Sequence, residues 1–378
     1  MGFFLPLITG TIWLFVLWRF VWPLPLAAGT RIGLALLLLL IAQYHWLVRA
    51  FFGSIASPEL PQEALIALAW AFGVLLLLAM LSLVRDVLGL LLYLPWRWGG
   101  RMLLTSPPLT VLIGLAAVVL SAIGVWNAIR IPHIETLAIT VPGLPASFDR
   151  YRIVQLTDTH ASRLLPEYWQ EAVVRRANSL HPDLIVITGD LADGSTTARA
   201  RDVAPLQELH APDGVLSIPG NHEYYSDYVD WMAAYKALGL NMLENEHVLI
   251  RRGDDTLAIA GLTDRQAIQF GQPAPDLQAA LQGIPKGVPV ILLDHRPEKA
   301  REHAEAGVAV QLSGHTHGGQ ILGGHWLTQL ANAGFVSGLY HVGDMTLYVS
   351  NGAGLWNGLA LRLGRPSEIT QILLRPAP

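Results

Sequence analysis

The feature that most constrains the fold is the scarcity of charge in the first third of the chain. Although 14% of all residues are charged, only ten charged residues lie between Met1 and Arg130, and most of them separate long apolar runs. A bilayer core about 30 Å thick requires about 20 apolar helical residues. The sequence therefore predicts a transmembrane region over residues 1–130, with four spans at 3–22, 32–50, 64–84 and 109–128.

Two parts of this region allow alternatives. The first apolar run has the length of a cleaved signal peptide, but three further spans follow it, which favours a membrane span. The segment 86–104, "DVLGLLLYLPWRWGGRMLL", contains Pro95 and two tryptophans beside Arg97. This composition is typical of a helix end in the headgroup zone, although the segment could also extend the third span.

The arginines predict the orientation, because cytoplasmic loops are enriched in Lys and Arg. The first connection is flanked by Arg19 and Arg31, and the third includes Arg85, Arg97 and Arg101, whereas the second carries Glu59 and Glu63 with Arg49. This pattern favours a multi-pass protein of the cell membrane whose residues after Arg130 are extracytoplasmic. The opposite orientation follows if Arg130, Arg150 and Arg152 are counted as the cytoplasmic positive charges.

From about residue 134 to 378 the pattern becomes that of an α/β domain. Residues 131–145 read as a connector that leads into an edge strand. Short apolar runs then begin near 152, 184, 214, 257, 288, 308 and 346, and amphipathic stretches such as "PEYWQEAVVRRANSLH" separate some of them. Alternation of this kind predicts an α/β sheet rather than an all-β or all-helical fold.

Polar side chains follow five of these apolar runs. In an open α/β sheet, ligands bind beyond the carboxyl ends of the strands, so these side chains should converge. Each acidic or amide side chain taken alone could simply cap a helix. The whole set, however, consists of donors that bind metals, and it lies in "DTH" at 158–160, "GD" at 189–190, "GNHE" at 220–223, "DH" at 294–295 and "GHTH" at 314–317.

The donor types suggest two ions. Asp158 and His160 stand close enough to share one ion with His317, while Asn221, His295 and His315 would hold a second. Asp190 has two carboxylate oxygens and would bridge them. Two cations about 3.5 to 4 Å apart can generate hydroxide and stabilise charge at phosphorus. Mixed nitrogen and oxygen donors suit Mn, Fe, Zn or Co.

His222 remains, next to Asn221. We expect it to face the substrate and to protonate the leaving oxygen; alternatively, it only orients a ligand. Glu223, Asp264 and Asp294 are weaker candidates for supporting or capping roles.

The order D-x-H, G-D, G-N-H-E, H and G-H-T-H closely resembles the calcineurin-like metallophosphoesterase superfamily. The motifs "GHTHGGQ", "YVSNGAG" and "PSEITQILL" are similar to a bacterial, membrane-associated phosphodiesterase branch. The resemblance covers residues 134–378. It implies a four-layer α/β/β/α sandwich, and it implies the same two ligand sets, which share Asp190, with catalytic His222 at the phosphate. The four spans are not part of the superfamily's pattern.

These features predict a membrane-anchored hydrolase that uses two divalent ions. An anchored site favours a phospholipid or a lipid-linked phosphodiester or pyrophosphate as its substrate. One alternative is an envelope nucleotide or general phosphodiesterase, and another is a metal-binding membrane receptor without turnover. A formal net charge of −4 and the lack of a basic stripe argue against a nucleic-acid partner.

Overall fold

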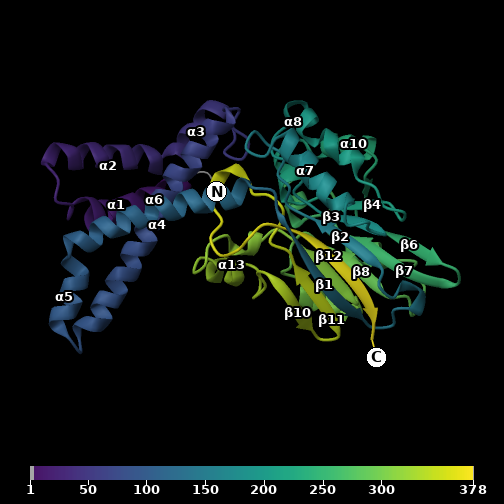
Figure 1. The fold of residues 1–378 in the computed structure, drawn as a ribbon. Helices are drawn as coiled ribbons and strands as arrows, with labels where there is room; N and C mark the ends of the chain where they lie inside the picture. The colour runs from purple at the N-terminus through teal and green to yellow at the C-terminus, as the bar shows by residue number, and fades with distance from the viewer. Residues whose placement is uncertain (1–3, 378) are drawn as a thin grey trace. The chain divides into compact units, whose positions relative to one another are not determined.

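The computed structural model describes residues 4–377, so residue 3 of the first predicted span lies outside the described range. Its internal contacts divide the chain into two compact units. The helical unit comprises Met1–Asn127 and Asn357–Leu363, and the sheet unit comprises Ala128–Trp356 and Gly364–Pro378. Figure 1 shows both units.

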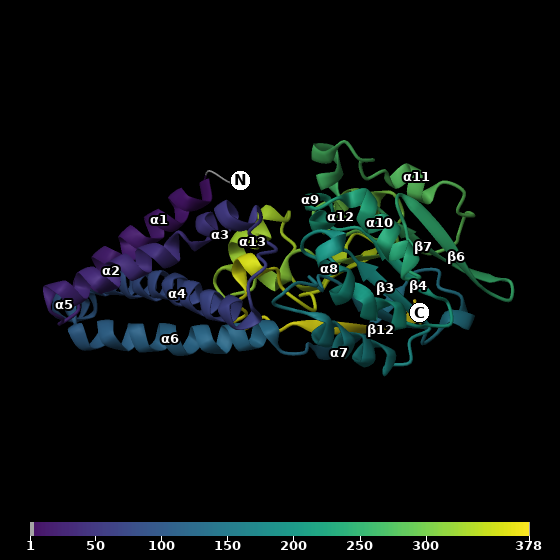
Figure 2. The same cartoon turned by 90° about the horizontal axis from the view of Figure 1, so that it is seen from above.

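The helical unit is built from apolar helices. They are α1 (Phe4–Val16) with a π-helical turn η1 (Leu17–Val21), α2 (Ala28–Ala42), α3 (Tyr44–Phe52), α4 (Gln62–Tyr93), α5 (Arg97–Thr105) and α6 (Pro107–Ile129). Figure 2 shows α6 running alongside α4, where Ser121 Oγ donates a hydrogen bond to Trp70 O at 2.7 Å. The segment 86–104 divides between two helices, because its first part completes α4 and its last part belongs to α5.

Two described helices, α4 and α6, are long and apolar enough to cross a membrane. The count rises to three if α2 and α3, which meet at a 48° bend, form one broken span. The apolar helix Leu5–Val21 is shorter than these. The prediction of apolar N-terminal helices is therefore confirmed at two to three spans, and a region of four transmembrane helices is not confirmed.

A short segment from near the C-terminus forms part of the helical unit. His45 Nε2 donates to Gly358 O at 2.6 Å, and Arg362 N donates to Gly124 O at 2.9 Å. Leu361 is fully buried, and a Cβ atom on Gly124 would lie 2.5 Å from its Cδ1. Glycine thus provides the space in α6 that this leucine fills.

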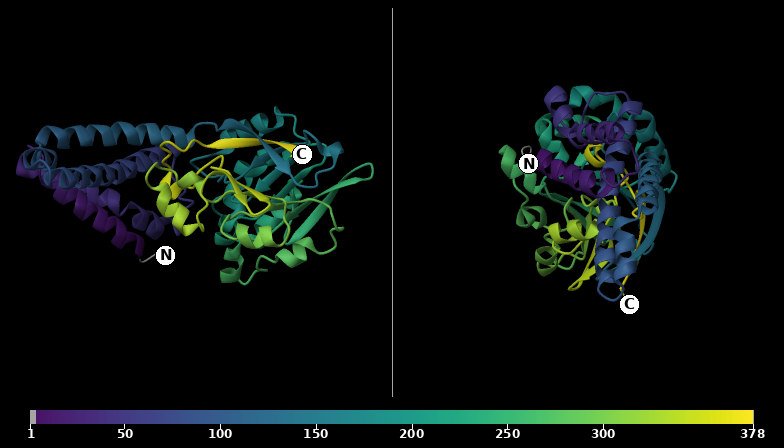
Figure 3. Two further views of the ribbon diagram at one scale, coloured as in Figure 1. Left: turned by 90° about the horizontal axis from the view of Figure 1, so that it is seen from below. Right: turned by 90° about the vertical axis from the view of Figure 1, so that its left-hand side faces the viewer.

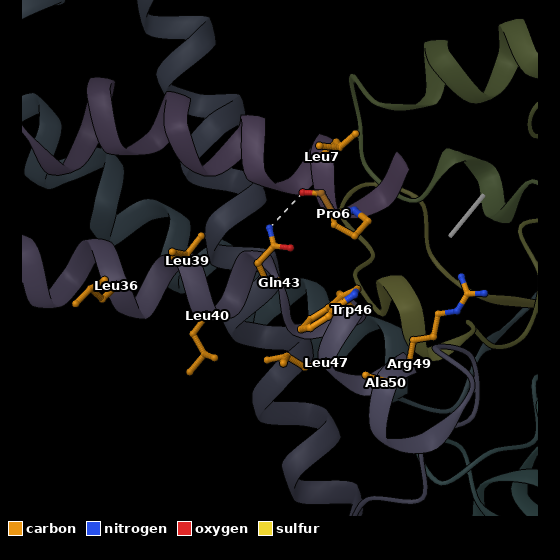
Figure 4. A pocket seen from close by; sticks show the side chains of 10 residues that line it. All are labelled: Pro6, Leu7, Leu36, Leu39, Leu40, Gln43, Trp46, Leu47, Arg49 and Ala50. Carbon is orange, nitrogen blue, oxygen red and sulfur yellow. Dashed lines mark hydrogen bonds between the residues drawn. The ribbon is translucent and has the colours of Figure 1, made fainter. Parts of the chain in front are cut away.

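An apolar groove lies along the first three helices (Figure 4). Its volume is about 1080 Å³. Leu36, Leu39 and Leu40 from α2 line it, and Gln43 lies at the bend, where its side-chain amide donates to Pro6 O at 3.2 Å. A groove with this lining suits hydrocarbon rather than water.

The sheet unit contains two six-stranded sheets. The first has the order β1 (His133–Val141), β12 (Glu368–Pro376), β2 (Arg152–Leu156), β3 (Leu184–Thr188), β4 (Val215–Ile218) and β5 (Asn241–Met242). The second has the order β10 (Gly338–Val342), β11 (Met345–Val349), β9 (Val310–Ser313), β8 (Val290–Leu293), β7 (Asp255–Gly261) and β6 (Glu246–Arg252). The hairpin of β6 and β7 is the green projection in Figure 3.

One apolar core joins the inner faces of the two sheets. It includes Ile153 and Val186 from the first sheet and Ile259 and Ile291 from the second, all fully buried. Strands buried on both faces read as continuous apolar runs such as "LIVIT", which is why the sequence indicated them clearly. The mixed α/β fold with two sheets is therefore confirmed.

Helices and short turns connect the strands. The α-helices are α7 (Glu167–Asn178), α8 (Thr196–Val203), α9 (Asn221–Tyr225), α10 (Tyr228–Ala237), α11 (Leu277–Leu281), α12 (Ala300–Glu305) and α13 (His325–Ala331). The 3-10 turns are η2 (Ala146–Phe148), η3 (Ala204–Glu208), η4 (Arg265–Phe270), η5 (His317–Gly319) and, in the helical unit, η6 (Asn357–Leu359). Strands β2, β3 and β4 run parallel, as do β7, β8 and β9, so the loops after them leave each sheet at one end.

Candidate metal centre

The loops that follow β2, β3, β8 and β9 bring the predicted ligands together in unusual backbone conformations. Five of these residues adopt left-handed φ angles: Asp158 (54°), His160 (44°), Asp190 (55°), His315 (68°) and His317 (49°). For residues with a Cβ atom, such angles cost about 1–3 kcal/mol each and persist only where the surroundings impose them. Their concentration at one place indicates a functional site.

Asp158, His160 and His317 form the first cluster, in which one donor atom from each residue lies within 4.8 Å of the others. His160 Nδ1 lies 3.1 Å from Asp193 Oδ1, so it carries the proton and leaves a lone pair on Nε2. Among the described residues this buried Nε2 has no hydrogen-bond partner, and it lies 3.9 Å from Asp158 Oδ1. A nitrogen lone pair that faces a carboxylate in a buried site fits a cation between them.

Asp190, His295 and His315 form the second cluster, with donor atoms again within 4.8 Å. His295 Nδ1 donates to Thr188 O at 2.7 Å, which points Nε2 inward. This Nε2 lies 3.2 Å from Asp190 Oδ2 and 3.2 Å from Asn221 Oδ1, and both of these oxygens are acceptors. Once His295 Nε2 is deprotonated, three lone pairs converge, and a cation would satisfy them all.

One oxygen of Asp190 faces both clusters. Its Oδ2 lies 3.2 Å from His295 Nε2 in the second cluster and 3.9 Å from His160 Nε2 in the first. A Cβ atom on Gly220 would lie 2.2 Å from Asp190 Oδ1, so only glycine leaves room for this carboxylate. Asp190 Oδ2 therefore lies within 4 Å of a histidine from each cluster.

The buried carboxylates strongly favour positive charge. Burial would by itself lower the pKa of His295, but Asp190 and Asp158 outweigh it and raise this pKa to about 10. Burial opposes ionisation of Asp190 as well, yet His295 and His222 hold its pKa well below the usual value. The pKa of Asp158 is raised, chiefly because its carboxyl group is buried. Divalent ions would supply the positive charge that this group of side chains requires.

Asp193 is a residue of this site that the sequence analysis missed. Its Oδ1 accepts from His160 Nδ1 and lies 2.5 Å from His222 Nδ1, so one buried carboxylate orients both imidazoles. His222 Nε2 in turn lies 3.9 Å from Asp190 Oδ2. The available signal was a second acid three residues after Asp190 on the same loop, in "GDLAD".

Arg296 was also missed, and it bears on the second cluster. Its Nη1 donates to His315 Nε2 at 2.8 Å, its Nη2 donates to Asn221 Oδ1 at 2.9 Å, and its Nε donates to Asp264 Oδ2 at 2.7 Å. The guanidinium therefore meets two of the predicted donors of the second ion. The donors fit a cation at both clusters, but at the second cluster the Arg296 side chain must withdraw to admit one.

The weaker candidates have supporting positions. The Glu223 carboxylate accepts hydrogen bonds from Gly220 N at 2.7 Å and Leu191 N at 2.8 Å, which joins the loops that follow β3 and β4. Asp264 Oδ2 accepts the hydrogen bond from Arg296 Nε. Asp294 accepts from Arg296 N at 3.4 Å, and burial raises its pKa to about 7.

Comparisons with known proteins agree on one family. Residues 151–319 match the family model for calcineurin-like phosphoesterases. The chain is similar to a transmembrane protein with metallophosphoesterase domain from Bos taurus, at 37% identity over 75% of this chain and 68% of the relative. A Danio rerio protein with the same name is 32% identical over 90% of this chain and 88% of the relative. An uncharacterized metallophosphoesterase of Bacillus subtilis is 35% identical over 69% of this chain and 93% of the relative.

Replacing the carboxylate that orients the two imidazoles should weaken metal binding. Asp193→Ala removes the acceptor that keeps the proton on His160 Nδ1, and we expect the affinity for Mn²⁺ to fall by about 10–100-fold. Calorimetric titration of the chelator-treated full-length chain in detergent measures this change. Asp230→Ala, which removes an exposed carboxylate from α10, is the control and should bind as the wild type does. Equal affinities in the two variants would contradict the role given to Asp193.

Proposed function

Since the chain belongs to the calcineurin-like phosphoesterase family, and is thus a metal-dependent phosphoester hydrolase associated with a membrane, we propose that it uses two divalent ions to cleave lipid phosphoesters. The bond would be a phosphodiester or pyrophosphate bond of a lipid or a lipid-linked substrate. The observation that carries the two-ion proposal is the position of Asp190, whose Oδ2 faces the histidines of both clusters.

The proposed ligands follow from the two clusters. Asp158, His160, Asp190 and His317 would hold one ion, and Asp190, Asn221, His295 and His315 the other. When bound, the two ions would activate water and stabilise negative charge on the phosphate. Manganese, iron, zinc and cobalt all suit such mixed donors.

His222 would serve the leaving group. By donating to Asp193 it keeps a proton on Nδ1, while its Nε2 is directed toward Asp190. About 11% of its side chain is exposed, whereas the side chains of His160 and His295 are fully enclosed. A second proton on Nε2 can therefore reach a phosphate oxygen or the departing oxygen.

The membrane anchor supports a lipid substrate. The sheet unit follows directly after α6, one of the two helices long and apolar enough to cross a bilayer. A catalytic domain held at a membrane meets lipid headgroups at a high effective concentration, whereas an anchor gives no such advantage for a freely diffusing nucleotide.

We further propose four crossings, at 3–22, 32–50, 64–84 and 109–128, with the catalytic domain outside the cytoplasm. The arginines support this topology, because the first and third connections contain or adjoin Arg19, Arg31, Arg97 and Arg101. Such connections remain in the cytoplasm. An even number of crossings then places the N-terminus and the residues after Arg130 on the other side.

The proposed bridging ligand has a direct test. The full-length chain in detergent with Mn²⁺ should hydrolyse bis-p-nitrophenyl phosphate, and Asp190→Asn should reduce the rate by more than about 100-fold, because both ions lose a ligand. Metal analysis should find two ions per wild-type chain. Asp254→Asn, in the exposed turn between β6 and β7, is the matched control. Equal rates for wild type and Asp190→Asn would exclude the bridge.

The same preparation decides the substrate class. Phosphate-ester cleavage is compared among phospholipids, lipid pyrophosphates and nucleotide sugars, with Asp190→Asn as the inactive reference. Faster turnover of nucleotide sugars than of either lipid class would refute the lipid proposal while leaving the hydrolase assignment intact.

The leaving-group role of His222 predicts an uneven loss of rate. His222→Ala should lose about 10²–10⁴-fold on a phosphodiester with an alkoxide leaving group, and far less on p-nitrophenolate, which departs without protonation. Rates on paired substrates measure the difference. A loss of the same size on both would show that His222 only positions the substrate.

The proposed topology can be tested with alkaline phosphatase fusions, since this reporter is active only outside the cytoplasm. A fusion after Pro378 should be active, and one after Trp98, in the third connection, should be inactive. The reverse pair of activities would overturn the orientation.

A further inference from the structure

The sheet unit carries an apolar surface beside the candidate metal centre. Residues 306–343 contain no Asp, Glu, Lys or Arg, in a chain of which 14% is charged. Within this stretch five large apolar side chains are exposed. One is Leu339 (48%) on β10, and the other four lie on α13 or shortly before it: Leu322 (57%), Trp326 (65%), Leu327 (75%) and Leu330 (81%). We call these four residues the apolar patch. Large exposed groups of apolar side chains mark interaction sites on otherwise soluble domains.

The apolar patch is centred on α13, which lies at the surface of the sheet unit (Figure 1). None of the seven residues of α13, all of which the structure describes, is buried. The spacing of Trp326, Leu327 and Leu330 places all three on one side of a helix. A short helix without a fully buried residue, which presents tryptophan and leucine outward, suits an apolar surface outside its own domain.

The apolar patch is attached to the turn that holds a proposed metal ligand. His317 begins η5, and α13 follows after a short loop. A Cβ atom on Gly319 would lie 2.4 Å from the Cα of His325, the first residue of α13, so the two backbones are in close contact. The apolar patch is therefore joined through one short loop to the turn that carries His317.

We infer that the apolar patch inserts into the surface of the lipid bilayer. The chain itself supports this occupant, because α6 ends at Ile129 and β1 begins at His133. Three residues lie between them, and the four Cα-to-Cα steps extend over at most about 14 Å, so the sheet unit starts close to the end of a membrane-crossing helix. Tryptophan and leucine are the side chains that amphipathic surface helices place at the boundary between headgroups and acyl chains.

A second connection lies next to the apolar patch. The chain leaves the helical unit at Leu363 and returns to the sheet unit at Gly364. A Cβ atom on Gly364 would lie 2.3 Å from Leu322 Cδ1, so the first residue of the apolar patch packs directly on this point of return. The apolar patch is thus adjacent to a place where the chain passes into the apolar helical unit.

Insertion would hold the metal centre at the depth of lipid headgroups. This inference concerns docking and holds whichever phosphoester is cleaved, so it goes beyond the proposed function. It gives the anchored domain a defined orientation, which a flexible tether alone would not provide.

The chain contains no cysteine, which allows a single label to be placed without background. Leu330→Cys, labelled with an environment-sensitive NBD group in the full-length chain in phosphatidylcholine nanodiscs, should show blue-shifted emission. It should be quenched at least about twofold more by doxyl-labelled lipid than by aqueous iodide. Val229→Cys on α10, at a site 64% exposed, is the matched control and should respond to iodide alone.

Three outcomes would overturn the inference. Iodide quenching at position 330 equal to that at 229 would mean that water covers the apolar patch. Protection from both quenchers, with energy transfer between differently labelled copies, would assign the surface to a second copy. Protection from both without transfer would assign it to contacts within the chain. A thermal transition equal to that of the wild type shows that each labelled variant is folded, and no readout depends on turnover.

Discussion

The site depends on one buried carboxylate. Asp190 lies between two groups of imidazoles, and its Oδ2 is 3.9 Å from His160 Nε2 and 3.2 Å from His295 Nε2. Burying an ionised carboxylate is costly unless positive charge is close by. The surrounding loops meet that requirement by placing imidazoles next to Asp190, and Asp193 and Thr188 orient these imidazoles by hydrogen bonds. Several of the candidate ligands have a left-handed backbone conformation in these loops.

The two clusters are not equivalent. At the first, the buried Nε2 of His160 has no hydrogen-bond partner among the described residues, so an ion meets a ready lone pair. At the second, Arg296 already donates to Asn221 and His315. A guanidinium is a cation, and its presence shows that these donors attract positive charge, but it must leave before a divalent ion can bind there.

The apolar helices and the candidate metal centre belong to different structural units. These units are not two successive segments of the sequence, because the helical unit includes a short stretch near the C-terminus. Residues 357–363 pack within the helical unit, although both flanking segments belong to the sheet unit. Leu361 fills the space that Gly124 leaves in α6. The helical unit is therefore more than an N-terminal anchor, because its core includes side chains from the end of the catalytic domain. An apolar patch on α13 would add another attachment to the bilayer.

The sequence by itself determined the apolar helices, the strands and the candidate metal-binding donors, because these follow from periodicity and from the residues directly after each strand. It did not reveal Asp193, Arg296, the packing of Leu361 or the exposure of α13. Those features depend on which distant segments meet, and even the second acid in "GDLAD" does not show which imidazoles it contacts. Only the tertiary structure decided that an arginine reaches Asn221 and His315, and that one carboxylate orients both His160 and His222, since long-range packing sets the distances between side chains.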